Sequence, residues 1–199
     1  MKLIALTGSI AMGKSEVARI LKEHDVPVLE SDAVVHDIYE DGSGAEILRN
    51  EFAAAVKGNV VQREVLSNMV LGAPQKLQRL EELIHPLVKA RQADFIAEQR
   101  KKNARAVVLD IPLLFETGTP SAFDAVVVVS APQDKQRQWA LSRKGMTEEK
   151  LRHILARQMP DSEKRKRASH VIKNDESLAD LEKKTLDVLN HIMAEEKRI

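Results

Sequence analysis

A glycine-rich segment near the amino terminus has the residue types and spacing of a phosphate-binding loop. Residues 8–15 read GSIAMGKS and fit the pattern GxxxxGK[ST], directly after a short apolar run. In such a loop the backbone N–H groups surround phosphate oxygens, and the dipole of the following helix adds to the attraction. Lys14 is expected to reach the β- and γ-phosphates, and Ser15 to place its hydroxyl on Mg²⁺. The predicted nucleotide-binding residues are Gly8, Ser9, Ile10, Ala11, Met12, Gly13, Lys14, Ser15 and Glu16.

The alternative is a glycine-rich turn that binds nothing. A buried strand before the segment and an amphipathic helix after it favour the phosphate loop, because both flank such loops in nucleotide-binding proteins. Ala11 and Met12 stand where many such loops have glycine or serine, and Met12 is expected to add bulk near the loop.

Two aspartates follow apolar runs and are candidates for chemistry at the phosphates. Asp110 ends the run RAVVLD, a common place for the carboxylate that orients Mg²⁺. Asp32 follows a shorter run, and ligands of parallel sheets collect at the carboxyl ends of strands. Asp32 could equally be the N-cap of the helix that follows it. The spacing alone leaves both interpretations of Asp32 open.

Pro112, Leu113 and Leu114 form an apolar stretch directly after Asp110. Their position at the end of a strand predicts either an apolar wall for an organic substrate or local core packing. His85 and Arg91 lie on a predicted long helix, where a lone histidine is more often structural and an arginine more often solvated.

Strands and helices alternate along the chain. Apolar runs predict strands at residues 3–6, 26–29, 105–110, 124–129 and 171–172. The alternation predicts βαβ units and a parallel sheet covered on both faces. Residues 32–103 contain no core strand and are predicted to be helical, mainly over 45–56 and 75–99, with a kink or a helix start at Pro86. A last helix is predicted from Ser177, with Asp180 completing a capping box.

Composition narrows the classes of function. The formal net charge is +1, which gives no support for a nucleic-acid partner. The chain has no cysteine, which excludes disulfides and thiolate metal sites. No apolar run approaches the ~20 residues that span a bilayer, and no targeting segment is visible. We therefore expect a cytoplasmic protein without a membrane partner.

Several motifs together resemble one family. The segments LTGSIAMGKS, LESDAVV, IHPLV, LDIPLLFE and RQMP follow the order and spacing of dephospho-coenzyme A kinases. The resemblance covers nearly the whole chain. It implies an α/β, P-loop NTPase three-layer fold with a five-stranded parallel sheet, a helical substrate-binding insertion and a helical lid. The implied nucleotide-binding core comprises residues 1–31, 104–138 and 168–199, the substrate domain 32–103, and the lid 139–167.

The resemblance also implies a reaction, the ATP- and Mg²⁺-dependent phosphorylation of the ribose 3′-hydroxyl of dephospho-coenzyme A. Asp32 matches the catalytic carboxylate, and Arg143 matches a lid arginine near the phosphates. Asn174 lies where the family surrounds the adenine of ATP. The implied acceptor-side residues are His85, Arg91, Asp110, Pro112, Leu113 and Leu114.

Two alternatives to this reaction remain. One is another nucleoside or nucleotide kinase of the same fold, and the other is a nucleotide-binding protein without phosphoryl transfer. The chain also departs from the family pattern at Glu16, next to the predicted Mg²⁺ ligand, and at Trp139, before the predicted lid.

Overall fold

The computed structural model describes residues 1–195, and its contacts divide the chain into two compact units. The first, called the sheet unit here, comprises Met1–Val28 and Gln99–Ile199. The second, called the helical unit, comprises Leu29–Glu98. The last four residues of the predicted core segment 168–199 lie outside the described residues.

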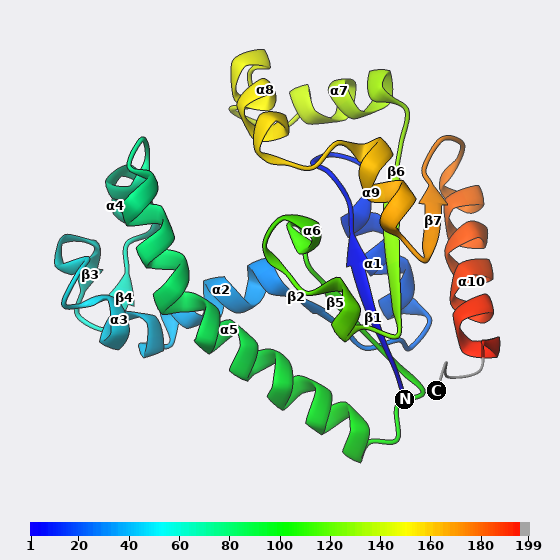
Figure 1. Ribbon diagram of the computed structural model, residues 1–199, viewed down its shortest axis with the longest axis horizontal. Coiled ribbons are helices and arrows are strands. Elements are labelled where there is room, and N and C mark those ends of the chain that lie inside the picture. The colour runs from blue at the N-terminus through cyan, green and yellow to red at the C-terminus, as the bar shows by residue number, and fades with distance from the viewer. Residues whose placement is uncertain (196–199) are drawn as a thin grey trace. The chain divides into compact units, whose positions relative to one another are not determined.

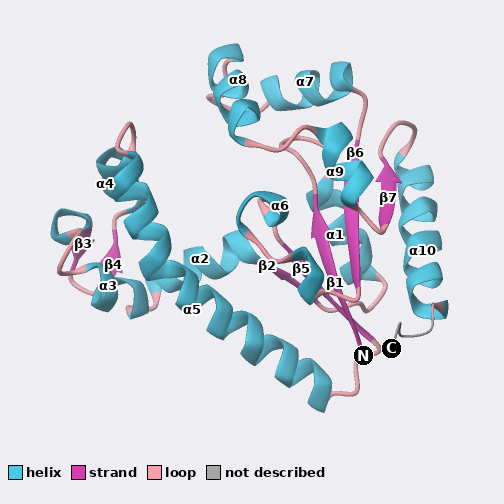
Figure 2. Ribbon diagram, in the orientation of Figure 1, coloured by secondary structure: helices cyan, strands magenta, loops and turns pink. Residues whose placement is uncertain are grey.

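A parallel sheet organises the sheet unit, with the strand order β2-β5-β1-β6-β7 (Figures 1 and 2). The strands of the sheet are β1 (Lys2–Thr7), β2 (Val28–Glu30), β5 (Ala106–Asp110), β6 (Ala125–Ser130) and β7 (His170–Lys173). Only the first residue of β2, Val28, belongs to the sheet unit. The central strand β1 pairs with β5, where Leu6 lies opposite Asp110, and with β6, where Thr7 lies opposite Val128. The segment that follows Thr7 therefore begins at the middle of the sheet, beside the end of β5. The five predicted strands and their parallel arrangement are confirmed.

Side chains alternate between the two faces of β1, as expected of a strand buried on both faces. Ile4 and Leu6 belong to a cluster that includes residues of α1 (Lys14–Glu23) and α10 (Leu178–Ala194). Ala5 belongs to a separate cluster with Leu114, at the start of α6 (Leu114–Thr117). Helical layers thus pack on both faces of the sheet, which gives the three-layer fold.

Four further helical segments belong to the sheet unit: η2 (Pro120–Ala122), α7 (Gln133–Leu141), α8 (Glu148–Arg157) and α9 (Asp161–Arg167). Residues 139–167, the lid that the family resemblance implies, contain the end of α7 and all of α8 and α9. Helix α10 begins with the predicted capping box, in which the Ser177 side chain accepts a hydrogen bond from the backbone N–H of Asp180. The Asp180 carboxylate in turn accepts one from the N–H of Ser177.

The helical unit has its own core, in which Ile38, Leu48 and Phe52 are buried together. Its elements in chain order are α2 (Ser31–Glu40), α3 (Ser43–Leu48), η1 (Ala53–Ala55), the antiparallel strands β3 (Val56–Lys57) and β4 (Val60–Val61), α4 (Arg63–Val70) and most of α5 (Pro74–Lys101). The prediction of one helix over 45–56 is wrong, because α3 ends at Leu48 and a separate 3₁₀ turn follows.

Helix α5 continues through Pro86, so the predicted helix start at that residue is wrong. Proline lacks the N–H that would bond to the carbonyl four residues earlier, which here belongs to Glu82. Pro86 and Glu82 are both exposed, so water can satisfy that carbonyl. Within residues 1–195, no helix combines the length and apolar character that a membrane span requires.

The adjacent leucines after β5 allow a test of this packing. Leu114 is 0% exposed, whereas Leu113 is 39% exposed. We expect Leu114→Ala to lower the free energy of unfolding by about 2–5 kcal/mol, because it leaves a cavity between the sheet and α6. Leu113→Ala is the matched control and should change it by less than about 0.5 kcal/mol. Urea unfolding of the two variants measures both values, and equal effects would contradict the assignment of Leu114 to the core.

Candidate active site

The predicted phosphate loop connects β1 to α1 in the structure. A Cβ on Gly8 would lie 2.7 Å from the carbonyl oxygen of Val129, so only glycine fits without a shift. Gly13 has a φ of 93° and directly precedes α1. Ala11 has a φ of 59°, a left-handed conformation that an alanine adopts at a higher energy than a glycine does. The strand–loop–helix context that the motif requires is present.

The side chain of Met12 is packed within the protein. Its side chain is only 1% exposed, and its sulfur accepts a hydrogen bond from the backbone N–H of Ala131 at 3.0 Å. The bulk of Met12 is therefore directed into the protein. Its thioether joins the loop to the segment that follows β6.

Lys14 and Asp110 form an ion pair at the carboxyl ends of β1 and β5. The ion pair places the Asp110 carboxylate next to the loop. Asp110 is only 3% exposed, so this carboxylate has little access to water. Ser15 is exposed in the first turn of α1. A serine hydroxyl and a carboxylate are hard oxygen donors that suit Mg²⁺, which commonly takes few protein ligands beside phosphates and water. Within residues 1–195, no group of three or more histidine or acidic side chains could hold a metal ion.

Glu16, which departs from the family pattern, pairs with Arg19 one turn along α1, with 2.5 Å between Oε1 and Nη2. Arg19 also pairs with Glu23. The Glu16 carboxylate is thus partly neutralised within the helix.

Three side-chain amides contact the backbone of the loop. Gln158 accepts a hydrogen bond from the N–H of Ile10 at 3.0 Å, and Gln136 donates one to the carbonyl of Ile10 at 2.9 Å. Asn174 donates one to the carbonyl of Met12 at 3.2 Å. The sequence analysis gave no role to either glutamine. Gln136 stands between Lys135 and Arg137 in the sequence, and no local pattern indicated which group it contacts.

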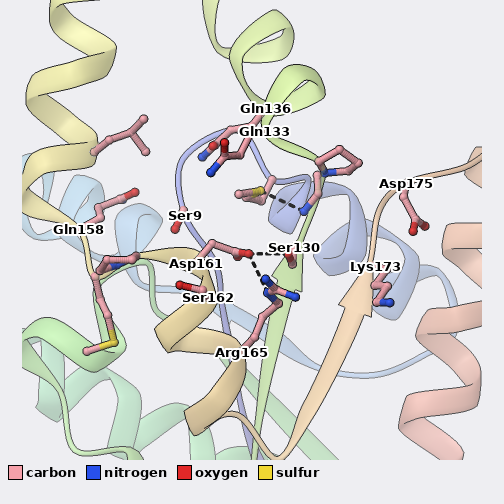
Figure 3. A pocket seen from close by; sticks show the side chains of 16 residues that line it. Ser9, Ser130, Gln133, Gln136, Gln158, Asp161, Ser162, Arg165, Lys173 and Asp175 are labelled. Carbon is pink, nitrogen blue, oxygen red and sulfur yellow. Dashed lines mark hydrogen bonds and ion pairs between the residues drawn. The ribbon is translucent and has the colours of Figure 1, made fainter.

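A cavity of about 620 Å³ opens beside the loop, and its size is typical of a small-molecule site. Ser9 and Met12 of the loop line it together with residues of α7 and α9 and of the end of β7. Figure 3 shows the Asp161 carboxylate between the Ser130 hydroxyl and the Arg165 guanidinium, at 2.8 and 3.0 Å. This polar group lies at the carboxyl end of β6, so the cavity offers both hydrogen-bonding and apolar contacts.

In the segment after Asp110, residues 112–114, some side chains are exposed and others are buried in the core. The Thr7 hydroxyl donates a hydrogen bond to the carbonyl of Pro112 at 3.2 Å, which holds this segment at the end of β1. Leu113 is partly exposed and can contact a ligand. The expectation that Leu114 lines an acceptor pocket is wrong, because its side chain is completely buried beneath α6. Core packing, the alternative interpretation, accounts for Leu114.

A buried ion pair lies behind this segment. Glu116 of α6 accepts a hydrogen bond from the N–H of Met159 at 2.7 Å, and its Oε1 lies 2.9 Å from the Nζ of Lys164 on α9. Lys164 is completely buried. A buried ammonium group needs a nearby opposite charge. Glu116 therefore ties both α9 and the segment containing Gln158 to α6.

The remaining acceptor-side candidates belong to the helical unit. Asp32 is exposed in the first turn of α2, and its alternative role as the N-cap is wrong, because Glu30 occupies that position. His85 is exposed on α5. Arg91 pairs with Asp41 at 2.5 Å. Hydrogen bonds from Ser43 lower the pKa of the Asp41 carboxyl below its usual value, and the charge of Arg91 lowers it further.

Arg143, the predicted lid arginine, is exposed just after α7. Its backbone N–H bonds to the carbonyl of Ala140, which closes the end of that helix. Trp139 is half-buried and packs against a cluster formed by Ala11 of the loop, Ala140 and Leu151. This departure from the family pattern thus contributes apolar packing beneath the phosphate loop.

Comparison with known proteins identifies the family. The family model described as Dephospho-CoA kinase matches residues 2–180. The chain belongs to the dephospho-CoA kinase family. It is 43% identical to the dephospho-CoA kinase of Rhizobium etli over 186 residues, which covers 94% of this chain and 91% of that protein. It is 48% identical to that of Mesorhizobium japonicum over 178 residues, or 89% and 90% of the two chains.

Solved structures agree with this assignment. A crystal structure of TT1252 from Thermus thermophilus has a TM-score of 0.82 at 35% identity and covers 96% of this chain and 97% of its own. The dephospho-CoA kinase from Campylobacter jejuni has a TM-score of 0.66 at 25% identity, with the same coverage. Shikimate kinase from Acinetobacter baumannii, at 18% identity and a TM-score of 0.51, shares the fold alone.

The buried ion pair yields a prediction about stability. Glu116→Gln keeps an acceptor for the N–H of Met159 but leaves Lys164 buried without its charged partner, and we expect it to cost about 3–5 kcal/mol of unfolding free energy. Adding Lys164→Met should restore most of the loss, since no buried charge remains. Chemical denaturation of the two single variants and the double variant measures the coupling.

Lys183→Met is a matched control, because Lys183 pairs with Asp187 on the surface of α10. An exposed pair of this kind contributes less than about 1 kcal/mol. A double variant as unstable as Glu116→Gln would show that the ion pair does not account for the loss.

Proposed function

We propose that this chain transfers the γ-phosphoryl group of ATP to the ribose 3′-hydroxyl of dephospho-coenzyme A, the last step of coenzyme A biosynthesis. The match of the dephospho-CoA kinase family model to residues 2–180 is the observation that carries the proposal. The phosphate loop at the centre of the parallel sheet supports it, because phosphoryl transfer depends on holding the phosphates in place.

The donor side of the proposed reaction lies in the sheet unit. The loop N–H groups bind the phosphates, and Lys14 exchanges its ion pair with Asp110 for contact with the β- and γ-phosphates. When bound by Ser15 and Asp110, Mg²⁺ neutralises charge on the phosphates. Residues 139–167 act as the lid, and Arg143 contacts the transferring group from it. An arginine in this role can raise the rate by about 10³ to 10⁵.

On the acceptor side, Asp32 orients the 3′-hydroxyl and accepts its proton as the bond to the γ-phosphorus forms. The bond between the γ-phosphorus and the β–γ bridging oxygen breaks, and ADP leaves with that oxygen. His85 and Arg91 of the helical unit bind the acceptor, with Arg91 exchanging its partner Asp41 for substrate. Pro112 and Leu113 offer apolar contact to its pantetheine arm.

The activity test measures ADP release from ATP and Mg²⁺ with dephospho-coenzyme A, AMP or adenosine as the acceptor. Stimulation by dephospho-coenzyme A alone is the expected result. Stimulation by AMP or adenosine instead would indicate another nucleotide or nucleoside kinase of this fold. ATP binding without stimulation by any acceptor would indicate a protein that binds nucleotide without transferring phosphate.

The proposed role of Asp32 predicts a loss of turnover. Asp32→Asn should lower kcat by about 10² to 10⁴, the usual contribution of a general base. The KM for ATP should stay within about twofold, because the loop is unaltered. Asp37→Asn, an exposed aspartate on the same helix, is the matched control and should keep normal turnover. Normal turnover in Asp32→Asn would remove Asp32 from the mechanism.

A further inference from the structure

The phosphate loop is held from outside by the amide groups of Gln136, Gln158 and Asn174. They come from α7, from the segment after α8 and from the residue that follows β7. Each makes one hydrogen bond to a backbone group of the loop. No cis peptide bond occurs among the described residues. In a planar trans peptide the C=O and the following N–H point in opposite directions, so a bond to one group orients the other.

Gln158 fixes the peptide between Ser9 and Ile10. Its Oε1 accepts from the N–H of Ile10 at 3.0 Å, which turns the carbonyl of Ser9 the opposite way. That carbonyl accepts a hydrogen bond from the N–H of Met12 at 3.3 Å, which closes a turn within the loop. Because the partner is an N–H group, position 158 must supply an acceptor.

Gln136 fixes the next peptide, between Ile10 and Ala11. Its Nε2 donates to the carbonyl of Ile10 at 2.9 Å, and the glutamine is only 6% exposed. The N–H of Ala11 therefore points away from α7. Position 136 must supply a donor, the opposite of the requirement at position 158.

Asn174 fixes the peptide between Met12 and Gly13 by donating to the carbonyl of Met12 at 3.2 Å, which turns the N–H of Gly13 away from Asn174. A Cβ on residue 13 would lie 2.1 Å from this Nδ2, so the glycine leaves room for the contact. The amide of Asn174 thus contacts the loop, whereas the family resemblance implies a position near the adenine of ATP.

We propose that Gln136, Gln158 and Asn174 are positioning residues for the phosphate loop. Gln136 and Asn174 turn the N–H groups of Ala11 and Gly13 toward the phosphates, and Gln158 holds the peptide whose Ser9 carbonyl closes the turn within the loop. The three amides hold three peptide planes of the loop from outside it. The inference rests on the proposed function only in taking a polyphosphate as the ligand of the loop.

The test measures the dissociation constants for Mg·ATP and for inorganic triphosphate with Mg²⁺, in variants of the full chain. Gln136→Met and Asn174→Leu remove a donor at nearly constant volume. Each should raise both constants about threefold to tenfold, the range expected for one lost hydrogen bond. An equal effect on the two ligands indicates the loop, since triphosphate has no nucleoside. A rise for ATP alone would overturn the proposal and indicate direct contact with the nucleoside.

Glutamate substitutions separate hydrogen bonding from charge. At pH 8, above the usual pKa of glutamate, Gln158→Glu and Gln136→Glu add the same charge beside Ile10. Gln158→Glu keeps the acceptor, whereas Gln136→Glu places a carboxylate against a carbonyl. We expect weaker triphosphate binding in Gln136→Glu than in Gln158→Glu by at least about threefold. Equal losses would overturn the proposal.

Gln138→Met is the matched control, because Gln138 is exposed on the same helix and no hydrogen bond of its side chain is found within residues 1–195. It should leave both constants unchanged. In the positioning variants the KM for dephospho-coenzyme A should stay at its wild-type value. A rise in that KM matching the rise in the two dissociation constants would indicate a general structural role instead. Triphosphate binding needs no acceptor, so these results do not depend on which acceptor the chain uses.

Discussion

The phosphate loop binds phosphates tightly only if its backbone N–H groups are already oriented toward the ligand before binding. An unrestrained peptide group can rotate. If the ligand had to order the loop on binding, the entropic cost of that ordering would reduce the affinity for the ligand. The loop has few polar side chains of its own, and Met12 is used for packing. The orientation of its peptides therefore comes from α7, from the segment after α8 and from the end of β7. The position of these elements on the sheet determines the shape of the loop.

The sheet supplies that position because its central strand is surrounded by later parts of the chain. β1 has β5 on one side and β6 on the other, so the loop starts between Asp110 and the end of β6. Behind it, the buried pair of Glu116 and Lys164 connects α6 to α9 and fixes Met159, the neighbour of Gln158. A charge pair in the core of the sheet unit thus supports a hydrogen bond on the loop.

Local patterns of residue type and spacing in the sequence predict much of the fold and of the phosphate loop. The five strands, the phosphate loop and the capping box of α10 each leave a local signature in residue type and spacing. The contacts of Gln136 and Gln158 leave none, because their partner Ile10 is more than a hundred residues away and is contacted through its backbone. The position of Leu114 could not be predicted for a similar reason. An apolar residue after a strand gives the same sequence pattern whether its side chain faces a ligand or the core. At Pro86 the sequence predicts a kink or a helix start, and α5 continues through it because the lost hydrogen bond falls at exposed residues, Pro86 and Glu82.

The chain order of the two units has a consequence for how the protein folds as it is synthesised. Both neighbours of β1 lie later in the chain than the whole helical unit. Residues Leu29–Glu98 therefore leave the ribosome while β1 still lacks β5 and β6, and their contacts within one continuous segment can form first. The pairing of Lys2 with Ala106 must close a loop that contains this insert, and ordering the insert reduces the freedom of that loop. Until then the apolar faces of β1 and α1 lack their partner strands, and apolar surface exposed in this way is prone to aggregation.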